Sequence, residues 1–447
     1  MVFWLAALPW PALCQLSEKR SPPVRHGNAW TEAYEWSAPA REGGKLILRA
    51  DMGSVEIAPG AGNQLEGHVV VRVYTGSEEK ARRVFDAFHL SARSLESGGV
   101  YVSAEFGGSR HHDGSMGAEF DIKVPARFNL DLETRGGDIG LQGALQGEAR
   151  LTTAGGDIHA LDISGPTRVE TAGGNIGMGN LGSRAEVRTA GGNISIGNVR
   201  GDATIETSGG GIQVGQVDGA LRAETAGGDV VIAGASGQVT AETAGGQIEV
   251  GPTGGSVRAQ TAGGNIHLRG ARGRVVAETA GGSIDLLQLR AGVRANTSAG
   301  RILAAFDAGT KTFVASQLET SMGDVYVYIP VGLALTIDAA IDAAAGHHIV
   351  TDFPLSILGD KEDFSERTIR GHGTLNGGGE VLRIRTVAGN IEIRKLDARS
   401  SEELKSHEDT SWNRLQEKQA EKAQRERERE QQRRERQREK EEEHEQE

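Results

Sequence analysis

Apolar and polar residues alternate with a period of two through the middle of the chain. In one stretch Leu221, Ala223 and Thr225 fall on one side of a predicted strand, while Arg222 and Glu224 fall on the other. A Gly-Gly pair and a second short apolar strand follow before the pattern begins again. The pattern therefore predicts units of two short strands joined by turns, and no helix fits within a unit.

This pattern is a true repeat. A motif close to T-[AS]-G-G-x-I recurs ten times, with one step of 19 residues followed by eight steps of 18. Such self-similarity at a fixed period indicates a stacked repeat architecture. The threonines of the ten copies are Thr134, Thr153, Thr171, Thr189, Thr207, Thr225, Thr243, Thr261, Thr279 and Thr297.

Two arrangements of these units are possible. In a β-solenoid each repeat is one rung, and equivalent residues stack about 4.8 Å apart in parallel ladders. In a meander each repeat is a hairpin. The invariant spacing favours the solenoid, because stacking places all the threonines in one column and all the Gly pairs in another. We expect these glycines to turn the chain at positive φ, which glycine reaches at little cost.

The flanking sequences predict a further division of the chain. Residues 29–130 carry larger side chains and form a predicted β-rich N-terminal cap, with one amphipathic helix over residues 78–91. Residues 131–305 are the predicted solenoid, and residues 306–396 a β-rich C-terminal cap. Caps are expected because an open solenoid end exposes unpaired strand edges. Degenerate copies of the motif, at residues 50–55, 320–325 and 386–391, stand outside the regular array. The fold class is thus all-β, a solenoid of about ten 18-residue rungs.

The C-terminal tail, residues 401–447, is made almost entirely of Glu, Arg, Lys and Gln. It has no apolar seam at heptad positions, so a helical or disordered solvated segment is favoured over a coiled coil. Because it offers few apolar residues for docking, we expect folding not to depend on it.

The N-terminus predicts export. Residues 2–14 form an apolar run that is too short to cross a bilayer and resembles the core of a secretory signal, so residues 1–14 are assigned to a signal segment. Cys14 is the sole cysteine, and disulfides are therefore not expected. A lipoprotein site at Cys14 is disfavoured by the bulky Leu13 before it. The predicted location is periplasmic, cell-surface or secreted.

The composition and the missing motifs argue against several classes of function. Aromatic residues are 4% of the chain and glycines number 64, which suits thin stacked rungs and not a large globular core. The net charge of −12 argues against a general nucleic-acid binder. No nucleophile elbow, phosphate loop or zinc signature occurs, and the array has no inserted loop of the kind that carries active sites in solenoid polysaccharide lyases. We therefore expect no enzyme activity, no catalytic residues, no cofactor and no metal.

Three groups of polar residues are candidate binding sites. Glu206, Glu224 and Glu242 form a predicted acidic stripe over three rungs, either a partner-binding surface or simply a solvated face. An Asp or Asn follows many Gly pairs; calcium binding there is disfavoured, because a calcium ion needs several oxygens and Asn and Asp also suit turns. The pairs His111-His112 and His347-His348 are expected to be loop residues, since neighbours on a strand point to opposite sides.

The order of several short segments resembles a bacterial β-strand-repeat family catalogued as putative adhesins, a domain of unknown function. The resemblance covers about residues 45–396. It rests on the segments Phe120–Pro125 (FDIKVP) and Leu130–Thr134 (LDLET), the Gly-Gly-Asp-Ile repeats, Val327–Pro330 (VYIP) with Leu335, and residues 375–379 (LNGGG) before residues 386–391 (TVAGNI). It implies a β-solenoid in an exported or envelope-associated protein without enzyme activity.

The sequence thus favours a non-enzymatic extracytoplasmic module that binds a cell-surface glycan or an envelope protein, or that serves as a scaffold. A polymerising structural protein and an envelope-stress sensor are the alternatives, and a polysaccharide-active enzyme is disfavoured.

Overall fold

The computed structural model describes residues 18–95, 98–107, 116–344, 346–359, 368–402 and 404. The predicted signal segment with Cys14, the pair His111-His112 and most of the charged tail lie outside these residues. The described chain divides into two compact units at residues 183 and 184, inside the predicted repeat array, and each unit is treated by itself.

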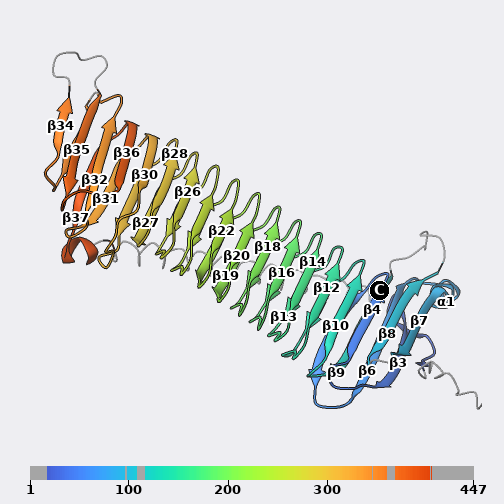
Figure 1. Ribbon diagram of the computed structural model, residues 1–447. Helices are drawn as coiled ribbons and strands as arrows, with labels where there is room; N and C mark the ends of the chain where they lie inside the picture. The colour runs from blue at the N-terminus through green and yellow to red at the C-terminus, as the bar shows by residue number, and fades with distance from the viewer. Residues whose placement is uncertain are drawn as a thin grey trace, which may run out of the picture. The chain divides into compact units, whose positions relative to one another are not determined.

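Each repeat is one rung of a parallel β-solenoid. Its first strand lies in one sheet, here sheet A, and its second in a facing sheet, sheet B (Figure 1). Successive rungs pair in parallel and in register: Leu132 lies opposite Leu151, and Ile139 opposite Ile158. The solenoid prediction is confirmed, and the meander is wrong. In the first unit the rungs are β10 (Asn129–Thr134), β12 (Ala149–Thr153) and β14 (Thr167–Thr171) in sheet A, with β11 (Ile139–Leu141), β13 (Ile158–Ala160) and β15 (Ile176–Met178) in sheet B.

The second unit continues the same plan. Its inward Val, Ile and Ala side chains are buried between the sheets, while the alternate residues point outward. Sheet A holds β16 (Ala185–Thr189), β18 (Ala203–Thr207), β20 (Leu221–Glu224), β22 (Val239–Glu242), β24 (Val257–Gln260), β26 (Val275–Thr279) and β28 (Val293–Thr297). Sheet B holds β17 (Ile194–Ile196), β19 (Ile212–Val217), β21 (Val230–Ala235), β23 (Ile248–Val250), β25 (Ile266–Leu268), β27 (Ile284–Leu289) and β29 (Ile302–Phe306).

The repeated threonine connects neighbouring rungs through its hydroxyl. Thr243 Oγ1 donates a hydrogen bond to the carbonyl of Gly228 on the preceding rung at 2.8 Å. The same oxygen accepts the backbone N–H of Gly246 on its own rung at 3.2 Å. The contact recurs along the array, for example from Thr261 to Gly246 and from Thr279 to Gly264. Threonine therefore satisfies two buried backbone groups that valine could not.

The second glycine of each pair is required by space and not by a positive φ. Of the second glycines in the ten repeats, Gly137 alone has a positive φ, so the predicted reason is wrong for the rest of the array. A Cβ on Gly246 would overlap the carbonyl oxygen of Gly228 on the preceding rung, whereas a Cβ on Gly245 would lie 3.2 Å from its nearest neighbour. The chain reflects this difference. Several rungs replace the first glycine, with Met52, Ala299, Met322 or Ala388, but all keep the second.

The degenerate copies are rungs too. In the first unit β4 (Lys45–Ala50) and β5 (Ser54–Gly60) pair in parallel with β10 and β11. A further pair, β8 (Val100–Phe106) and β9 (Met116–Pro125), lies beyond them. Antiparallel strands complete this end: β7 (Phe88–Ser94) on β8, and β6 (Gln64–Tyr74), β3 (Ala29–Pro39), β1 (Glu18–Arg20) and β2 (Val24–His26) beyond β9.

The predicted helix is present but shorter. Helix α1 spans Glu78–Ala87, with Ser77 as its N-cap, and buries Ala81 and Phe85. The prediction extended it to residue 91, which is wrong for the last four residues. From Phe88 onward alternate side chains are buried, and the segment pairs as strand β7. Phe88 fits both the helical and the alternating pattern, and strand pairing with β8 decided between them.

At the far end of the second unit, β30 (Ser316–Met322) and β31 (Val325–Pro330) form one rung, and β36 (Val381–Ala388) and β37 (Ile391–Leu396) form the next. Thr320 and Thr386 are paired, so two degenerate copies far apart in sequence are adjacent. β32 (Leu335–Ile341), β35 (Ile369–Leu375) and β34 (Ser356–Gly359) complete sheet A, and β33 (Ile349–Thr351) completes sheet B.

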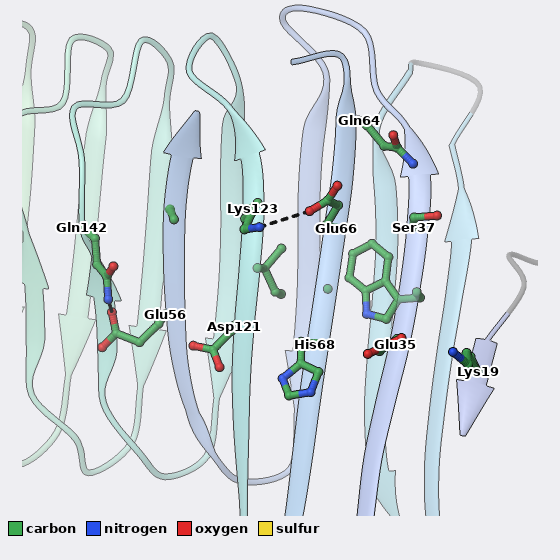
Figure 2. A pocket seen from close by; sticks show the side chains of 14 residues that line it. Lys19, Glu35, Ser37, Glu56, Gln64, Glu66, His68, Asp121, Lys123 and Gln142 are labelled. Atoms are coloured by element: carbon green, nitrogen blue, oxygen red, sulfur yellow. Dashed lines mark hydrogen bonds and ion pairs between the residues drawn. The ribbon is translucent and has the colours of Figure 1, made fainter. Parts of the chain in front are cut away.

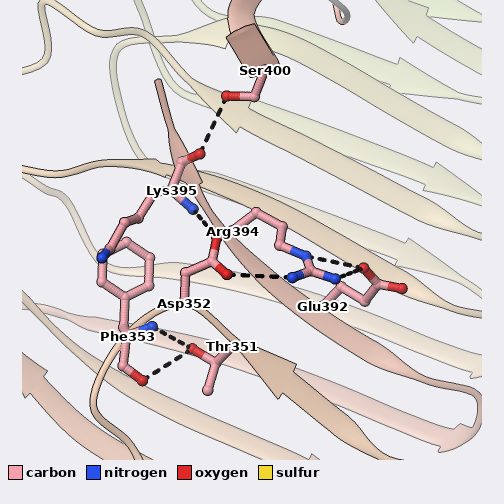
Figure 3. Close-up of polar contacts among 7 residues, drawn as sticks. All are labelled: Thr351, Asp352, Phe353, Glu392, Arg394, Lys395 and Ser400. Atoms are coloured by element: carbon pink, nitrogen blue, oxygen red, sulfur yellow. Dashed lines mark hydrogen bonds and ion pairs between the residues drawn. The ribbon is translucent and has the colours of Figure 1, made fainter. Parts of the chain in front are cut away.

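A second helical segment follows β37, at residues 398–402 and 404. Asp397 caps it: its carboxylate accepts the backbone N–H of Ser400 at 2.8 Å, and the Ser400 hydroxyl accepts the backbone N–H of Asp397 at 2.9 Å. The hydrogen bonds that Ser400 donates to this carboxylate, from its backbone N–H and from its hydroxyl, lower the pKa of Asp397. Just before it, Asp352 binds Arg394 and the backbone N–H of Lys395 (Figure 3). The helical chain thus begins before residue 401, where the sequence placed the start of the tail. None of the helices in the described residues is long and apolar enough to cross a membrane.

Candidate functional site

The predicted acidic stripe lies on the outward face of sheet A in the second unit. Glu206, Glu224 and Glu242 occupy paired positions on β18, β20 and β22, so the stacking brings them together on adjacent rungs. Each carboxylate also has an arginine partner. Arg188 lies 3.3 Å from Glu206 and Arg258 lies 3.8 Å from Glu242, while Arg222 contacts Glu224.

The stripe is therefore a mixed-charge ladder and not an acidic surface. It continues beyond the predicted residues, where Gln260 donates a hydrogen bond to Glu278 and Arg294 lies 3.8 Å from the same carboxylate. The side chains are partly exposed, and exposed ion pairs of this kind contribute little to stability. The face presents both donors and acceptors, but it offers no net acidic charge to attract a cation.

The column of Asp and Asn residues after the Gly pairs holds the backbone together. Asp229 Oδ1 accepts the backbone N–H of Gln247 on the next rung at 2.9 Å, and Asn265 Oδ1 accepts that of Ser283 at 2.8 Å. The same bond joins Asp138 to Asp157 in the first unit. One oxygen of each of these side chains thus links two rungs. Within the described residues no group of three or more His, Asp or Glu side chains could hold a metal ion.

His347 and His348 lie in the loop before β33. Their backbone N–H groups donate to the Ala344 carbonyl and to the Asn390 side chain respectively. The backbones of the two residues thus hold the loop in place against β37, as the sequence predicted for loop histidines.

A polar groove in the first unit was not found from the sequence. It has a volume of about 680 Å³ and lies on the outward face of sheet B, over β1, β3, β6, β9 and β5 (Figure 2). Strand alternation places polar side chains on this face and apolar ones underneath. Beneath it the Trp36 ring covers Gly67 on the neighbouring strand, where any Cβ would overlap the ring. The Trp36 indole is buried, so aromatic stacking with a ligand is not available in the groove.

Four titratable side chains cross the groove in one row, here called the carboxylate–imidazole row. Glu35 on β3 is paired with His68 on β6, His68 with Asp121 on β9, and Asp121 with Glu56 on β5. Neighbouring strands lie about 4.8 Å apart, so the row presents a polar group at each such step. Figure 2 shows the four side chains side by side. Among the described residues, Glu35, His68 and Asp121 have no hydrogen-bond or ion-pair partner.

A second row lies beside the first. Lys123 Nζ lies 3.3 Å from a Glu66 carboxylate oxygen, and Gln142 donates a hydrogen bond to Glu56 at 3.2 Å. The Glu56 carboxylate occupies the space where Gly140 on β11 has no side chain. Glu56 is thus fixed at one end of the row, while the other three residues of the row face the groove.

The groove can bind a polar ligand by hydrogen bonding, since each carboxylate offers two acceptor oxygens and an imidazole offers both a donor and an acceptor. Its residues come from the five strands β1, β3, β5, β6 and β9 and from Gln142 just after β11, between positions 19 and 142. The period-two pattern predicts that each points outward, but only strand register brings them together.

One comparison with known proteins, the family match, agrees with this architecture. Residues 106–275 match the model of the Toastrack DUF4097 family. This stretch is similar to a Toastrack domain. The family resemblance stated above is confirmed, and the matched residues span parts of both units and the array from β9 to β26. The search of curated proteins found no match.

Two solved structures are similar to the chain. One is a putative adhesin from Bacteroides fragilis, 15% identical, with a TM-score of 0.29; the alignment covers 56% of this chain and 95% of that one. The other is a putative cell adhesion protein from Clostridium sporogenes, 9% identical, with a TM-score of 0.15; the alignment covers 85% of this chain and all of that one.

Proposed function

We propose that the protein is an exported, non-enzymatic, adhesin-like binding module, and that its ligand binds in the groove of the first unit. The observation that carries this proposal is the carboxylate–imidazole row. Three of its four side chains face a groove without partners among the described residues, whereas the carboxylates of the sheet A ladder are all paired with arginines. Polar side chains that have no internal partners and are held on a rigid sheet are suited to binding a ligand.

The chemistry of the groove favours a hydroxyl-rich ligand, and we propose a cell-surface glycan. The lining contains four carboxylates, from Glu35, Glu56, Glu66 and Asp121, against the two ammonium groups of Lys19 and Lys123. This excess of acceptors suits sugar hydroxyls and amino groups, and it disfavours a phosphorylated or sulfated ligand. An extended chain lying across the strands would meet a hydrogen-bonding group about every 4.8 Å.

Binding to immobilised glycans, including isolated peptidoglycan, tests this assignment. The groove variant Glu35→Gln/Asp121→Asn keeps the shape of both side chains and removes their charge. The matched variant Glu206→Gln/Glu224→Gln/Glu242→Gln does the same on the sheet A ladder. We expect the groove variant to bind at least tenfold more weakly, and the ladder variant to bind within twofold of the unchanged protein. The reverse result would assign binding to the predicted stripe, and equal binding by all three proteins would refute both surfaces.

Export and the lack of catalysis are tested separately. Cell fractionation should find the protein outside the cytoplasm and shortened near Cys14, and the bound glycan should be recovered with its chain length unchanged. A polymerising structural role is the alternative, and sedimentation would reveal it as filaments that form without ligand.

A further inference from the structure

The turn between β35 and β36 contains the one asparagine of the chain that a glycine follows, Asn376. Both residues of the pair have a positive φ, 51° at Asn376 and 91° at Gly377. The backbone N–H of Gly378 donates to the Leu375 carbonyl at 3.0 Å and closes the turn. Such a turn favours an Asn-Gly pair, because these two residue types tolerate a positive φ with little strain.

The side chain of Asn376 links this turn to a second one. Its Nδ2 donates hydrogen bonds to the carbonyls of Val331 at 2.8 Å and of Leu333 at 2.9 Å. These carbonyls belong to the connection through which the chain crosses from β31 in sheet B to β32 in sheet A. Because both partners are acceptors, the side-chain atom that faces them must be the amide nitrogen. The amide thus holds this crossing connection of the C-terminal cap in place.

The asparagines after the Gly pairs use the opposite end of the amide. Oδ1 of Asn265 accepts the backbone N–H of Ser283, and Asp229 makes the same contact with Gln247 at the equivalent position of an earlier rung. A carboxylate can therefore replace the amide in that column without loss of the hydrogen bond. It cannot do so at Asn376, where a carboxylate would offer only acceptors to two carbonyl oxygens.

An Asn-Gly pair also undergoes a spontaneous reaction that needs only water. The backbone nitrogen of Gly377 attacks Cγ of Asn376, and the new C–N bond closes a succinimide ring. The Cγ–Nδ2 bond breaks, and Nδ2 leaves as ammonia with the proton from the glycine nitrogen. Water then opens the ring at either carbonyl and leaves an aspartate or an isoaspartate. Gly377 has no side chain to obstruct the attack, and no described atom lies within 4 Å of the position that its Cβ would take.

We propose that Asn376 is a deamidation site and that its deamidation loosens the C-terminal cap irreversibly. While the amide is bound to the two carbonyls, the side chain is held in one orientation, so the reaction proceeds through local opening of this turn. Afterwards the turn cannot close in the same way, because an aspartate repels both carbonyl oxygens and an isoaspartate lengthens the backbone. Deamidated molecules therefore accumulate with age and have a loosened cap and an unchanged repeat array.

Incubation of the full chain at pH 8, followed by mass spectrometry of its peptides, tests the site. We expect Asn376 to deamidate before every other asparagine of the described chain, and at least about tenfold more slowly than in an isolated peptide of residues 370–382. Earlier reaction at another of these asparagines would overturn the site. A rate equal to that of the peptide would overturn the role of the two carbonyls, because the amide would then be free in the folded chain.

The variant Asn376→Asp tests the consequence. Hydrogen exchange of the backbone amides of residues 331–336 should become at least about tenfold faster, while exchange in the rungs of residues 185–297 stays unchanged. The matched control, Asn265→Asp, should leave exchange at Ser283 within about twofold of the unchanged protein, because its carboxylate still accepts the hydrogen bond. Unchanged exchange at residues 331–336 in Asn376→Asp would overturn the proposed loosening.

A second variant, Asn376→Gly, keeps the test valid if Asn376→Asp impairs folding. Glycine adopts the positive φ of this position but has no amide, so exchange at residues 331–336 should be faster than in the unchanged protein and slower than in Asn376→Asp. Exchange equal to that of the unchanged protein would show that the amide does not hold the connection, and it would overturn the proposal.

Discussion

The Thr–Gly turns and the outward strand faces belong to the same rungs, but only the turns keep the same residues from rung to rung. At the turn, the backbone of one rung lies so close to the next that a Cβ on Gly246 or Gly264 has no space. On the outward faces, Ser195, Gln213, Val231 and Glu249 succeed one another at equivalent positions. The residue type is constant at the turns, where the backbones of neighbouring rungs come close together. It varies at the outward positions of the strands, where side chains have more space.

The two outward faces of the second unit also differ from each other. On sheet A, charges are paired between neighbours and remain partly exposed, as with Arg188 and Glu206. On sheet B, Glu249 is buried and its carboxyl has a raised pKa. Alternation gives both faces outward polar positions, and the burial of each side chain decides its pKa.

The largest effect is expected at the turn. Gly264→Ala should lower the free energy of unfolding by about 3 kcal/mol or more, because its Cβ would overlap backbone atoms of Gly246 that cannot move without breaking the ladder. Gly263→Ala is the matched control: its Cβ would lie 3.6 Å from the nearest atom, and stability should change by less than about 0.5 kcal/mol. Chemical denaturation measures both, and equal losses would contradict the close-stacking explanation.

A smaller, pH-dependent effect is expected at Glu249. The folded carboxyl has a pKa of about 7 against an ordinary value of 4.5. Between these values the folded protein keeps a proton that the unfolded chain releases, so stability is greatest below pH 4.5 and falls as the pH rises to 7. Glu249→Gln removes this loss and should be more stable than the unchanged protein by about 2 kcal/mol at pH 8, and similar to it at pH 4.

The control for this variant is Glu242→Gln on sheet A, whose carboxylate is partly exposed beside Arg258. Its effect should stay below about 0.5 kcal/mol at both pH values. A Glu249→Gln variant with the same small effect at pH 8 would show that the face over Glu249 is open to water.

The smallest of these effects is expected at the threonine. Thr243→Val keeps the shape of the side chain but leaves the Gly228 carbonyl and the Gly246 N–H without their hydroxyl partner. The loss should be about 1 to 2 kcal/mol. Thr240→Val, on the outward side of the same strand, serves as the control and should change stability little. If Thr243→Val leaves the free energy of unfolding unchanged, side-chain packing and not hydrogen bonding explains why threonine recurs at this position.

Much of the fold was predictable because the repeat period and the strand alternation are written directly in the sequence. The positions of Leu221, Ala223 and Thr225 inside the rung are confirmed. Helix α1 was found from its apolar spacing, although its end was misplaced, because Phe88 satisfies helical and strand spacing equally. The helix start at Asp397 was missed, and the Asp-x-x-Ser capping pattern at Asp397 and Ser400 is the signal that could have revealed it.

The candidate site was less predictable. The three glutamates of the stripe could be found from the sequence because they recur at a constant interval. Their arginine partners could not, and these arginines balance the negative charge of the stripe. The groove was missed because Glu35, His68 and Asp121 are not regularly spaced along the sequence. Only the pairing of β3, β6 and β9 brings them together.

The sequence by itself determined the rung: its length, its inward and outward sides, the threonine column and the glycine at each turn. These properties follow from local alternation and from a constant period, which need no knowledge of distant contacts. The tertiary structure decided the reason for the second glycine, the partners of Glu206, Glu224 and Glu242, the rows of the groove, and the burial of Glu249. Each of these depends on which atoms of separate segments come within contact distance, and only the paired strands define that.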